Sequence, residues 1–235
     1  MQREEIVQPY YAGSSDDPAI NQSSQSGMLD LKVARSADGG TTWTQEMVAP
    51  RVRPVLGIHS VAADAEGREF MVWSARDEDG RVHVYFSRSL KPGTPWTQPV
   101  TIGQPDHSGT LAWVVARGDG GVAVGYLGSD YADARTESRP WTVRVAVSQD
   151  AGDSWSIYNA SDHTVYTGSQ SNSLSLTYDL LGLVVDEAGF LHLAYPRRVT
   201  VDGADLNQIE YTRQVSGPPL GGRSRPAQTG PDLRR

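Results

Sequence analysis

The stretch SADGGTTW at residues 36–43 decides the fold class of this chain, because its pattern returns twice. SQDAGDSW at residues 148–155 shares the frame Ser-x-Asp-x-Gly-x-x-Trp, and SLKPGTPW at residues 89–96 keeps the Ser, Gly and Trp but has Lys91 in the Asp position. The copies begin about 55 residues apart, a spacing typical of repeat architectures. The sequence therefore predicts a repeated structural unit.

The residue types of the frame are those of a tight turn. Asp and Ser side chains accept hydrogen bonds from nearby backbone N–H groups. Gly adopts the positive φ of a compact hairpin, and Trp supplies a large apolar surface. We therefore assign a structural role to Ser36, Asp38, Gly40, Trp43, Ser89, Gly93, Trp96, Ser148, Asp150, Gly152 and Trp155. The three tryptophans are expected to pack alike.

Apolar residues stand three, five and seven positions before the serine of each frame. These trios are Leu29, Leu31 and Val33, then Val82, Val84 and Phe86, then Trp141, Val143 and Val145. A period of two predicts a half-buried strand, and a hairpin pattern precedes the second and third of these strands. A weaker fourth match, Asn207, Ile209 and Tyr211, precedes Gln214.

Each repeat thus reads as strand A, turn, strand B, loop, strand C, box turn and strand D, which is the four-stranded antiparallel blade of a β-propeller. The predicted fold is all-β, with about four blades of which the first and last are incomplete. We expect residues 1–214 to form this partial propeller. Residues 215–235 are rich in Pro, Gly and Arg and are expected to be a disordered tail.

The frame resembles the Asp-box of the sialidase (BNR-repeat) superfamily, whose members are β-propellers. Sialidase-type propellers have six blades, so the chain reads as a slice of a longer propeller or as a truncated product. Sialidases hold the carboxylate of a sugar with three arginines, use a Tyr–Glu pair as nucleophile and an Asp as acid/base. The resemblance therefore implies glycan recognition, with hydrolysis in the catalytic members.

Binding residues of the sialidase-like families lie on the rim formed by B–C loops and D–A connections. Here we expect long polar loops on that rim at residues 13–27, 48–59, 75–81, 103–109, 128–140, 159–179 and 196–206. The candidate catalytic residues on them are Asp16, Asp17, Tyr131 and Glu137. Because guanidinium groups bind carboxylates through paired hydrogen bonds, the candidate ligand-binding residues are Arg51, Arg53, Arg76, Arg139 and Arg197.

The sialidase pattern is incomplete in this chain. The family's Phe-Arg-Ile-Pro motif lies on strand A of the first blade, and no such strand is expected here. The similar Arg51-Val52-Arg53-Pro54 follows the first box, and Ala12-Gly13 stands where another Arg is expected. The sequence favours a non-catalytic or incomplete carbohydrate-recognising unit. The alternatives are part of an exo-α-sialidase-type glycoside hydrolase whose arginine triad lies partly outside this chain, and a structural protein-interaction propeller.

Composition narrows the choice of partners. The formal net charge of −7 disfavours nucleic acid, and no apolar run approaches the ~20 residues of a membrane helix. The chain has no cysteine, and its five histidines show no paired ligand spacing, so no metal and no cofactor are expected. We expect a glycan or protein ligand on the long-loop rim. The polar start of the chain shows no signal peptide, so we expect an exported parent protein to carry its signal upstream.

Overall fold

The computed structural model describes residues 6–13, 27–170 and 181–222, and fifteen strands are found there. They form four antiparallel sheets. The first two sheets contain β1 (Ile6–Gly13), β2 (Leu29–Ser36) and β3 (Thr44–Val52), then β4 (Pro54–Ala63), β5 (Glu69–Arg76), β6 (Val82–Ser89) and β7 (Val100–Ile102). The third contains β8 (Ser108–Arg117), β9 (Gly121–Ser129), β10 (Arg139–Ser148), β11 (Ser156–Asn159) and β12 (Tyr166–Gly168), and the fourth contains β13 (Gly182–Val185), β14 (Leu191–Val201) and β15 (Ala204–Arg213).

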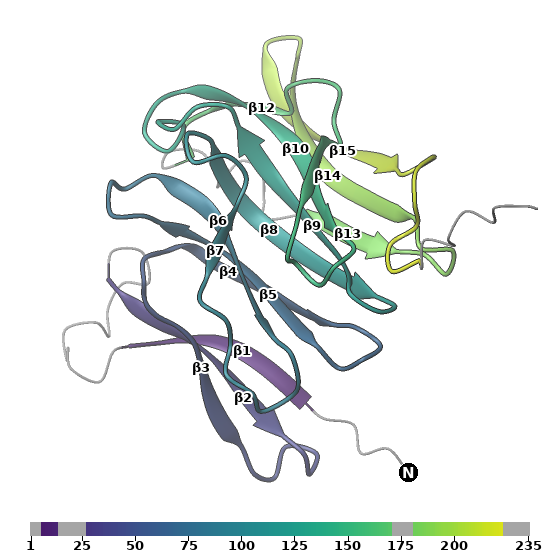
Figure 1. The fold of residues 1–235 in the computed structure, drawn as a ribbon. Helices are drawn as coiled ribbons and strands as arrows, with labels where there is room; N and C mark the ends of the chain where they lie inside the picture. Colours follow the sequence, from purple (N-terminus) through teal and green to yellow (C-terminus); the bar gives the residue numbers. More distant parts are fainter. Residues whose placement is uncertain (1–5, 14–26, 171–180, 223–235) are drawn as a thin grey trace, which may run out of the picture.

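The four sheets follow one another in chain order and pack face to face as blades (Figure 1). Their inner strands β4, β8 and β13 are neighbours, because β8 contacts both of the others. The predicted all-β architecture of four blades with incomplete ends is therefore confirmed. Within the described residues, the first blade has no strand A and the last has no strand D. No helix in that part of the chain is long and apolar enough to cross a membrane.

Strand C of each blade lies where the period-two pattern predicts it, as β2, β6, β10 and β15. In the first three blades the trio before each box serine is at most 8% exposed. Each trio packs against the following blade: Leu31 and Val33 share a core cluster with Met71 and Trp73 of β5, and Val143 shares one with Leu193 of β14. The period-two apolar residues before each box serine therefore mark the hydrophobic cores between neighbouring blades.

The two complete boxes have the same hydrogen bonds. The hydroxyl of Ser36 donates to Asp38 Oδ1 over 2.8 Å and accepts from the Gly40 N–H over 2.7 Å. Asp38 in turn accepts from the backbone N–H and the hydroxyl of Thr42. Residues Ser148, Asp150, Gly152 and Ser154 repeat all four contacts. The frame is a turn that supplies its own backbone hydrogen-bond partners.

The box that has Lys91 in place of Asp keeps its turn by a different route. The hydroxyl of Ser89 donates to the Lys91 carbonyl oxygen over 2.7 Å. Thr94 Oγ1 accepts from the Lys91 N–H over 3.2 Å and lies 3.0 Å from the Ser89 hydroxyl. The Thr94 hydroxyl therefore replaces some of the hydrogen bonds that an Asp carboxylate makes in the two complete boxes.

The expectation that the three box tryptophans pack alike is wrong for Trp43. Trp96 is buried, and Trp155 is half-buried against Phe86 of the preceding blade, with ring centroids 5.0 Å apart. Trp43 is 45% exposed. The box tryptophan fills a gap against strand C of the preceding blade, and the described residues provide no such blade before β1–β3.

The box carboxylates stabilise the fold when ionised, and we expect the protein to lose this stabilisation in acid. Hydrogen bonds from the backbone N–H and hydroxyl of Thr42 lower the pKa of Asp38 to about 2. Burial opposes the same shift at Asp150, but hydrogen bonds led by that of the Ser154 hydroxyl lower its pKa to about 2. A carboxyl with a lowered folded-state pKa stabilises the fold above its unfolded value of roughly 4, and this contribution is lost as the pH falls toward the folded value.

The measurement is the urea midpoint between pH 7 and pH 2, for wild type and Asp150→Asn. The variant keeps the shape of the side chain but cannot ionise, so its midpoint should fall less steeply in acid than that of wild type. Asp79→Asn, at an exposed position outside the boxes, serves as the control. Parallel curves for wild type and Asp150→Asn would contradict the expectation.

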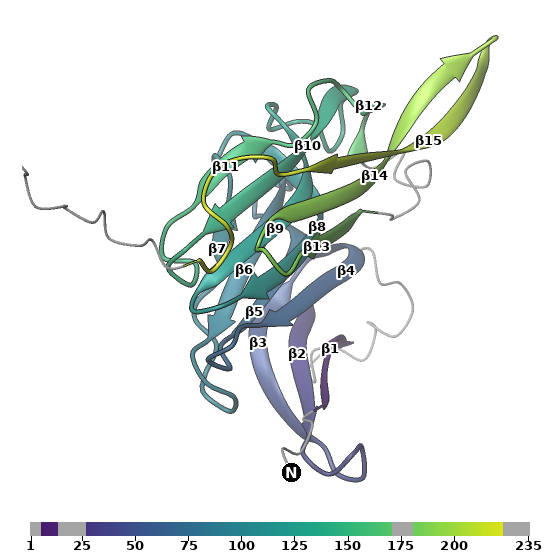
Figure 2. The same ribbon diagram turned by 90° about the vertical axis from the view of Figure 1, so that its right-hand side faces the viewer.

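Three segments differ from the sequence-based expectation. Residues 48–59 are not a long loop, because β3 continues to Val52 and β4 begins at Pro54. Residues 196–206 are not a loop: β14 and β15 extend through them as one long hairpin that projects beyond the rest of the fold (Figure 2). Residues 214–222 cross the box-turn rim and bury Leu220, whose N–H donates to the Gly189 carbonyl oxygen over 2.8 Å. This part of the expected tail is packed, and residues 223–235 lie outside the described residues.

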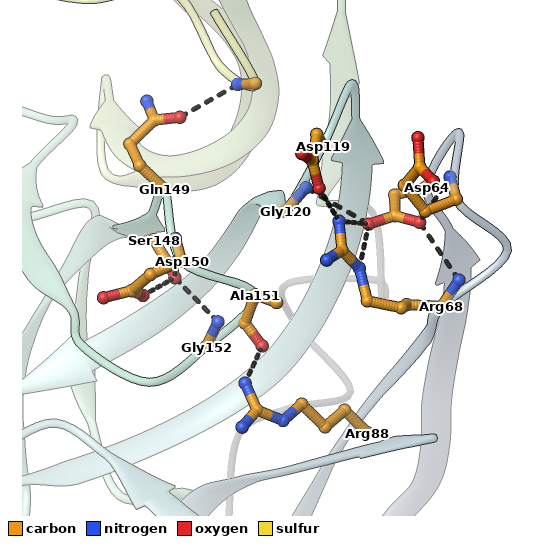
Figure 3. Close-up of polar contacts among 12 residues, drawn as sticks. Asp64, Arg68, Arg88, Asp119, Gly120, Ser148, Gln149, Asp150, Ala151 and Gly152 are labelled. Atoms are coloured by element: carbon orange, nitrogen blue, oxygen red, sulfur yellow. Dashed lines mark hydrogen bonds and ion pairs between the residues drawn. The ribbon is translucent and has the colours of Figure 1, made fainter. Parts of the chain in front are cut away.

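Polar contacts on the box-turn rim join the second, third and fourth blades (Figure 3). Arg68 binds Asp64 of its own turn and Asp119 of the third blade. Gln149 accepts a hydrogen bond from the Gly221 N–H over 2.9 Å, which connects residues 214–222 to the third box. The backbone of Gly221 also passes so close to Gly121 that a Cβ on Gly121 would collide with it, so that position requires glycine.

Candidate functional site

A cleft of about 720 Å³ opens between the first two blades at the rim opposite the box turns. The end of β3, the start of β4 and the end of β5 meet there because strands D and B both finish at this rim. The cleft is lined by Met28, Ala49, Pro50, Arg51, Val52, Arg53, Trp73, Ala75, Arg76, Asp77, Glu78, Tyr85, Gln98 and Pro99. Trp73 is stacked on Tyr85 with ring centroids 5.9 Å apart, so a rigid aromatic pair supports one wall.

Three of the five predicted ligand-binding arginines line this cleft: Arg51, Arg53 and Arg76. Arg51 has a φ of 54°, and its N–H donates to Asp30 Oδ1 over 3.1 Å at an irregularity in the pairing of β2 with β3. A non-glycine residue in the left-handed region stores backbone strain, and such strain gathers at functional sites.

Arginines outnumber carboxylates in the lining of the cleft, which contains Arg51, Arg53 and Arg76 beside Asp77 and Glu78. Burial lowers the pKa of Arg76, and the charges of Arg135 and Arg53 lower it further. Arg135 belongs to the loop between β9 and β10, so a cation of the third blade lies near Arg76 although it is not part of the lining of the cleft. Among the described residues, Arg51, Arg53 and Arg135 form no ion pair. Several guanidinium groups held near one another favour the binding of an anion.

Two carboxylates share the cleft with these cations. The Asp77 oxygens accept a hydrogen bond from the Arg81 N–H over 2.8 Å and lie 3.2 Å from His83 Nε2. Asp77 therefore has partners within its own hairpin. Glu78 is exposed at the tip of the same turn.

The second predicted group, Tyr131, Glu137 and Arg139, shares the loop between β9 and β10. Arg139 is engaged by Asp133, with Nε donating to Oδ1 over 2.7 Å, and its guanidinium lies 4.9 Å from the centre of the Tyr131 ring. Glu137 is exposed. The candidates Asp16 and Asp17 lie outside the described residues.

Arg197 belongs to a third group, between the third and fourth blades. Its Nη1 donates to Glu210 Oε1 over 3.0 Å, and Glu210 Oε2 lies 2.9 Å from His163 Nε2. Tyr195 stands opposite Glu210 in the β14–β15 pairing, and burial followed by the Glu210 charge raises its pKa. A phenol with a raised pKa is a poor nucleophile at neutral pH.

Sequence reasoning missed Arg135, Tyr195, Glu210 and His163. Arg135 lies between Tyr131 and Glu137 in a loop that was already a candidate, but only the placement of the third blade brings it near Arg76. In the described residues, no group of three or more His, Asp or Glu side chains could hold a metal ion.

No protein-family model and no curated protein sequence matches this chain. Solved structures do match it. Trypanosoma rangeli sialidase, as a covalent intermediate with 2,3-difluorosialic acid, superposes on 88% of this chain and 34% of its own, with a TM-score of 0.54 and 11% identity. Penicillium chrysogenum α-L-arabinanase complexed with arabinobiose superposes on 92% of this chain and 61% of its own, with a TM-score of 0.55 and 13% identity.

The chain thus spans about a third of the length of the sialidase and about three fifths of the arabinanase. At these identities the likeness shows the fold alone. The sheets of three to five antiparallel strands and these superpositions together establish that this chain has the fold of the sialidase-like β-propellers.

Proposed function

We propose that this chain is a carbohydrate-recognising propeller unit that binds a carboxylate-bearing glycan in the cleft between the first two blades and does not hydrolyse it. The observation that carries the proposal is the convergence of Arg51, Arg53 and Arg76 on one cleft, with Arg135 close to Arg76. The two solved structures named above hold 2,3-difluorosialic acid and arabinobiose, respectively.

The physical argument rests on charge and on the size of the cleft. Like charges held together in a partly buried place destabilise a fold, and a bound carboxylate offsets that cost through paired hydrogen bonds from guanidinium groups. A volume of about 720 Å³ is within the usual range for small-molecule sites. The Tyr85 ring, fixed by its stacking on Trp73, adds an apolar surface of the kind that sugar rings contact.

Tyr131 and Tyr195 are the described candidates for a nucleophile, and the surroundings of both favour binding over catalysis. Arg139 beside Tyr131 is already paired with Asp133, and burial raises the pKa of Tyr195. Covalent glycoside chemistry needs an activated nucleophile and an acid within reach of one bond. An exported or extracellular location, where glycans are exposed, fits a binding function.

Calorimetric titration with 3′-sialyllactose and with lactose tests the proposal. We expect binding of the anionic sugar and none of the neutral one. Arg53→Met and Arg76→Met should each weaken the binding roughly tenfold or more, because each removes charged hydrogen bonds. Arg81→Met, on the same hairpin but outside the cleft, should leave it unchanged. Equal binding of lactose, or unchanged affinity in Arg53→Met and Arg76→Met, would refute the proposed site.

A fluorogenic sialoside tests the non-catalytic part. We expect no hydrolysis above that of a heat-denatured sample. Turnover that disappears in Asp17→Asn or Tyr131→Phe would instead establish the alternative, a glycoside hydrolase with its active site on this chain.

A further inference from the structure

The interfaces between blades reuse one pairing of side chains. The residue three positions before a box serine packs with the box tryptophan of the next blade. Val33 and Trp96 share one core cluster, and Phe86 lies edge-on to Trp155 with ring centroids 5.0 Å apart. One half of the pairing comes from strand C, and the other half comes from the turn before strand D of the following blade.

The last blade presents the first half of this pairing to solvent. Its strand C, β15, places Tyr211 three positions before Gln214, at the position of Phe86, and Ile209 at the position of Val84. Phe86 and Val84 are 2% and 0% exposed, whereas Tyr211 and Ile209 are 62% and 64% exposed. Val184 of β13 is also 60% exposed. We call Val184, Ile209 and Tyr211 the trailing face.

The first blade presents the second half. Trp43 occupies the box position at which Trp96 and Trp155 pack against a preceding blade, and it is 45% exposed. Met47 of β3 pairs with Lys32, on the face of β2 opposite to Leu31 and Val33, and is also 45% exposed. We call Trp43 and Met47 the leading face.

We propose that two copies of this chain associate head to tail, with the trailing face of one copy packed against the leading face of the next. The occupant is a second copy because this chain carries both halves of a side-chain pairing that it already forms twice internally, between Val33 and Trp96 and between Phe86 and Trp155. Docking would place Tyr211 against Trp43, as Phe86 lies against Trp155. The contact joins two different surfaces, so it is heterologous.

An arginine at the edge of the trailing face fits the same arrangement. One position before its box serine, Arg88 donates to the Ala151 carbonyl oxygen of the next blade over 2.6 Å (Figure 3). Arg213 holds the equivalent position before Gln214, is exposed, and forms no ion pair within the described residues. In the docked pair its counterpart is the carbonyl group of Gly39, which stands in the first box where Ala151 stands in the third.

Analytical ultracentrifugation of the full chain tests the proposal. The weight-average mass of the wild type should rise with concentration from the monomer value of 25.5 kDa to at least twice that value. Tyr211→Glu and Trp43→Glu should each remain monomeric over the same range. Both side chains are exposed in the isolated chain, so unfolding midpoints near that of wild type would show that the variants fold.

Mixing the two variants separates a head-to-tail contact from a symmetric one. Tyr211→Glu keeps an intact leading face and Trp43→Glu an intact trailing face, so an equimolar mixture should form a dimer that contains one copy of each. Tyr158→Glu is the matched control, because Tyr158 is a tyrosine on an outer strand with 59% exposure and belongs to neither face. It should associate as wild type does.

The proposal is overturned if the wild type stays monomeric at its highest soluble concentration. It is equally overturned if the mixture of the two variants stays monomeric, or if Tyr158→Glu abolishes association as fully as Tyr211→Glu does.

Discussion

Replacing Arg35 by methionine is expected to lower the free energy of unfolding by about 3–5 kcal/mol. Arg35 lies on β2 and is 5% exposed; it pairs with Glu69 at the start of β5 and, through Nε, with Glu46 Oε1 over 2.9 Å. It therefore joins the first blade to the second. Without the guanidinium, Glu69 would be left as a buried carboxylate that has lost its cation, which is the costly way to break an ion pair.

Urea unfolding of three variants checks this expectation. Arg35→Met/Glu69→Gln should recover part of the loss, because the double variant no longer buries an uncompensated charge. Arg81→Met removes only an exposed partner 3.9 Å from Asp79 and should change stability by less than about 1 kcal/mol. If Arg35→Met proved no more destabilising than Arg81→Met, the pair would have no structural role.

Trp141→Ala is the second large effect, with an expected loss of about 3–5 kcal/mol. The side chain is 2% exposed, lies in the core between the third and fourth blades, and donates from Nε1 to the Gly168 carbonyl oxygen over 2.9 Å. Truncation would leave a cavity and remove a side-chain hydrogen bond that reinforces the backbone pairing of β12 with β10. The loss of stability is measured by thermal unfolding, followed by near-ultraviolet circular dichroism.

Trp113→Ala is the control, because the Trp113 ring is 41% exposed and its removal opens no closed cavity. We expect it to cost clearly less than Trp141→Ala. Similar losses in the two variants would mean that stability follows the number of tryptophans rather than their burial.

Local chemistry made the blades predictable from the sequence. The box turns are closed by contacts within five residues, as between Asp38 and Thr42, so their residue types are sufficient to identify them. The trio before each box is buried by the next blade, and Val84 and Val143 therefore carry the period-two pattern in the sequence itself. The β14–β15 hairpin also had a local signal. Its turn is Asp202-Gly203, both with positive φ, between alternating apolar residues.

The candidate site was less predictable because it depends on the relative position of blades. Arg53 and Arg76 are separated by a whole strand pair, and Arg135 comes from the third blade, so no spacing in the sequence relates the three. The exposure of Trp43 is likewise decided by a neighbour outside its own motif. The contacts of a residue within its own turn can be predicted from the sequence. Its contacts across an interface between blades cannot, because they depend on how the blades are placed.

The packing of residues 214–222 has a consequence for the order of events during synthesis. Each sheet is built from consecutive strands, so it can form soon after its own residues leave the ribosome. Leu220, however, is seated beside the Gly189 turn, and the carbonyl group of Leu220 accepts from Arg117 Nη1 over 3.1 Å. The junction between the third and fourth blades is thus completed only after residue 222 has been released, later than the other blade junctions in the described part of the chain.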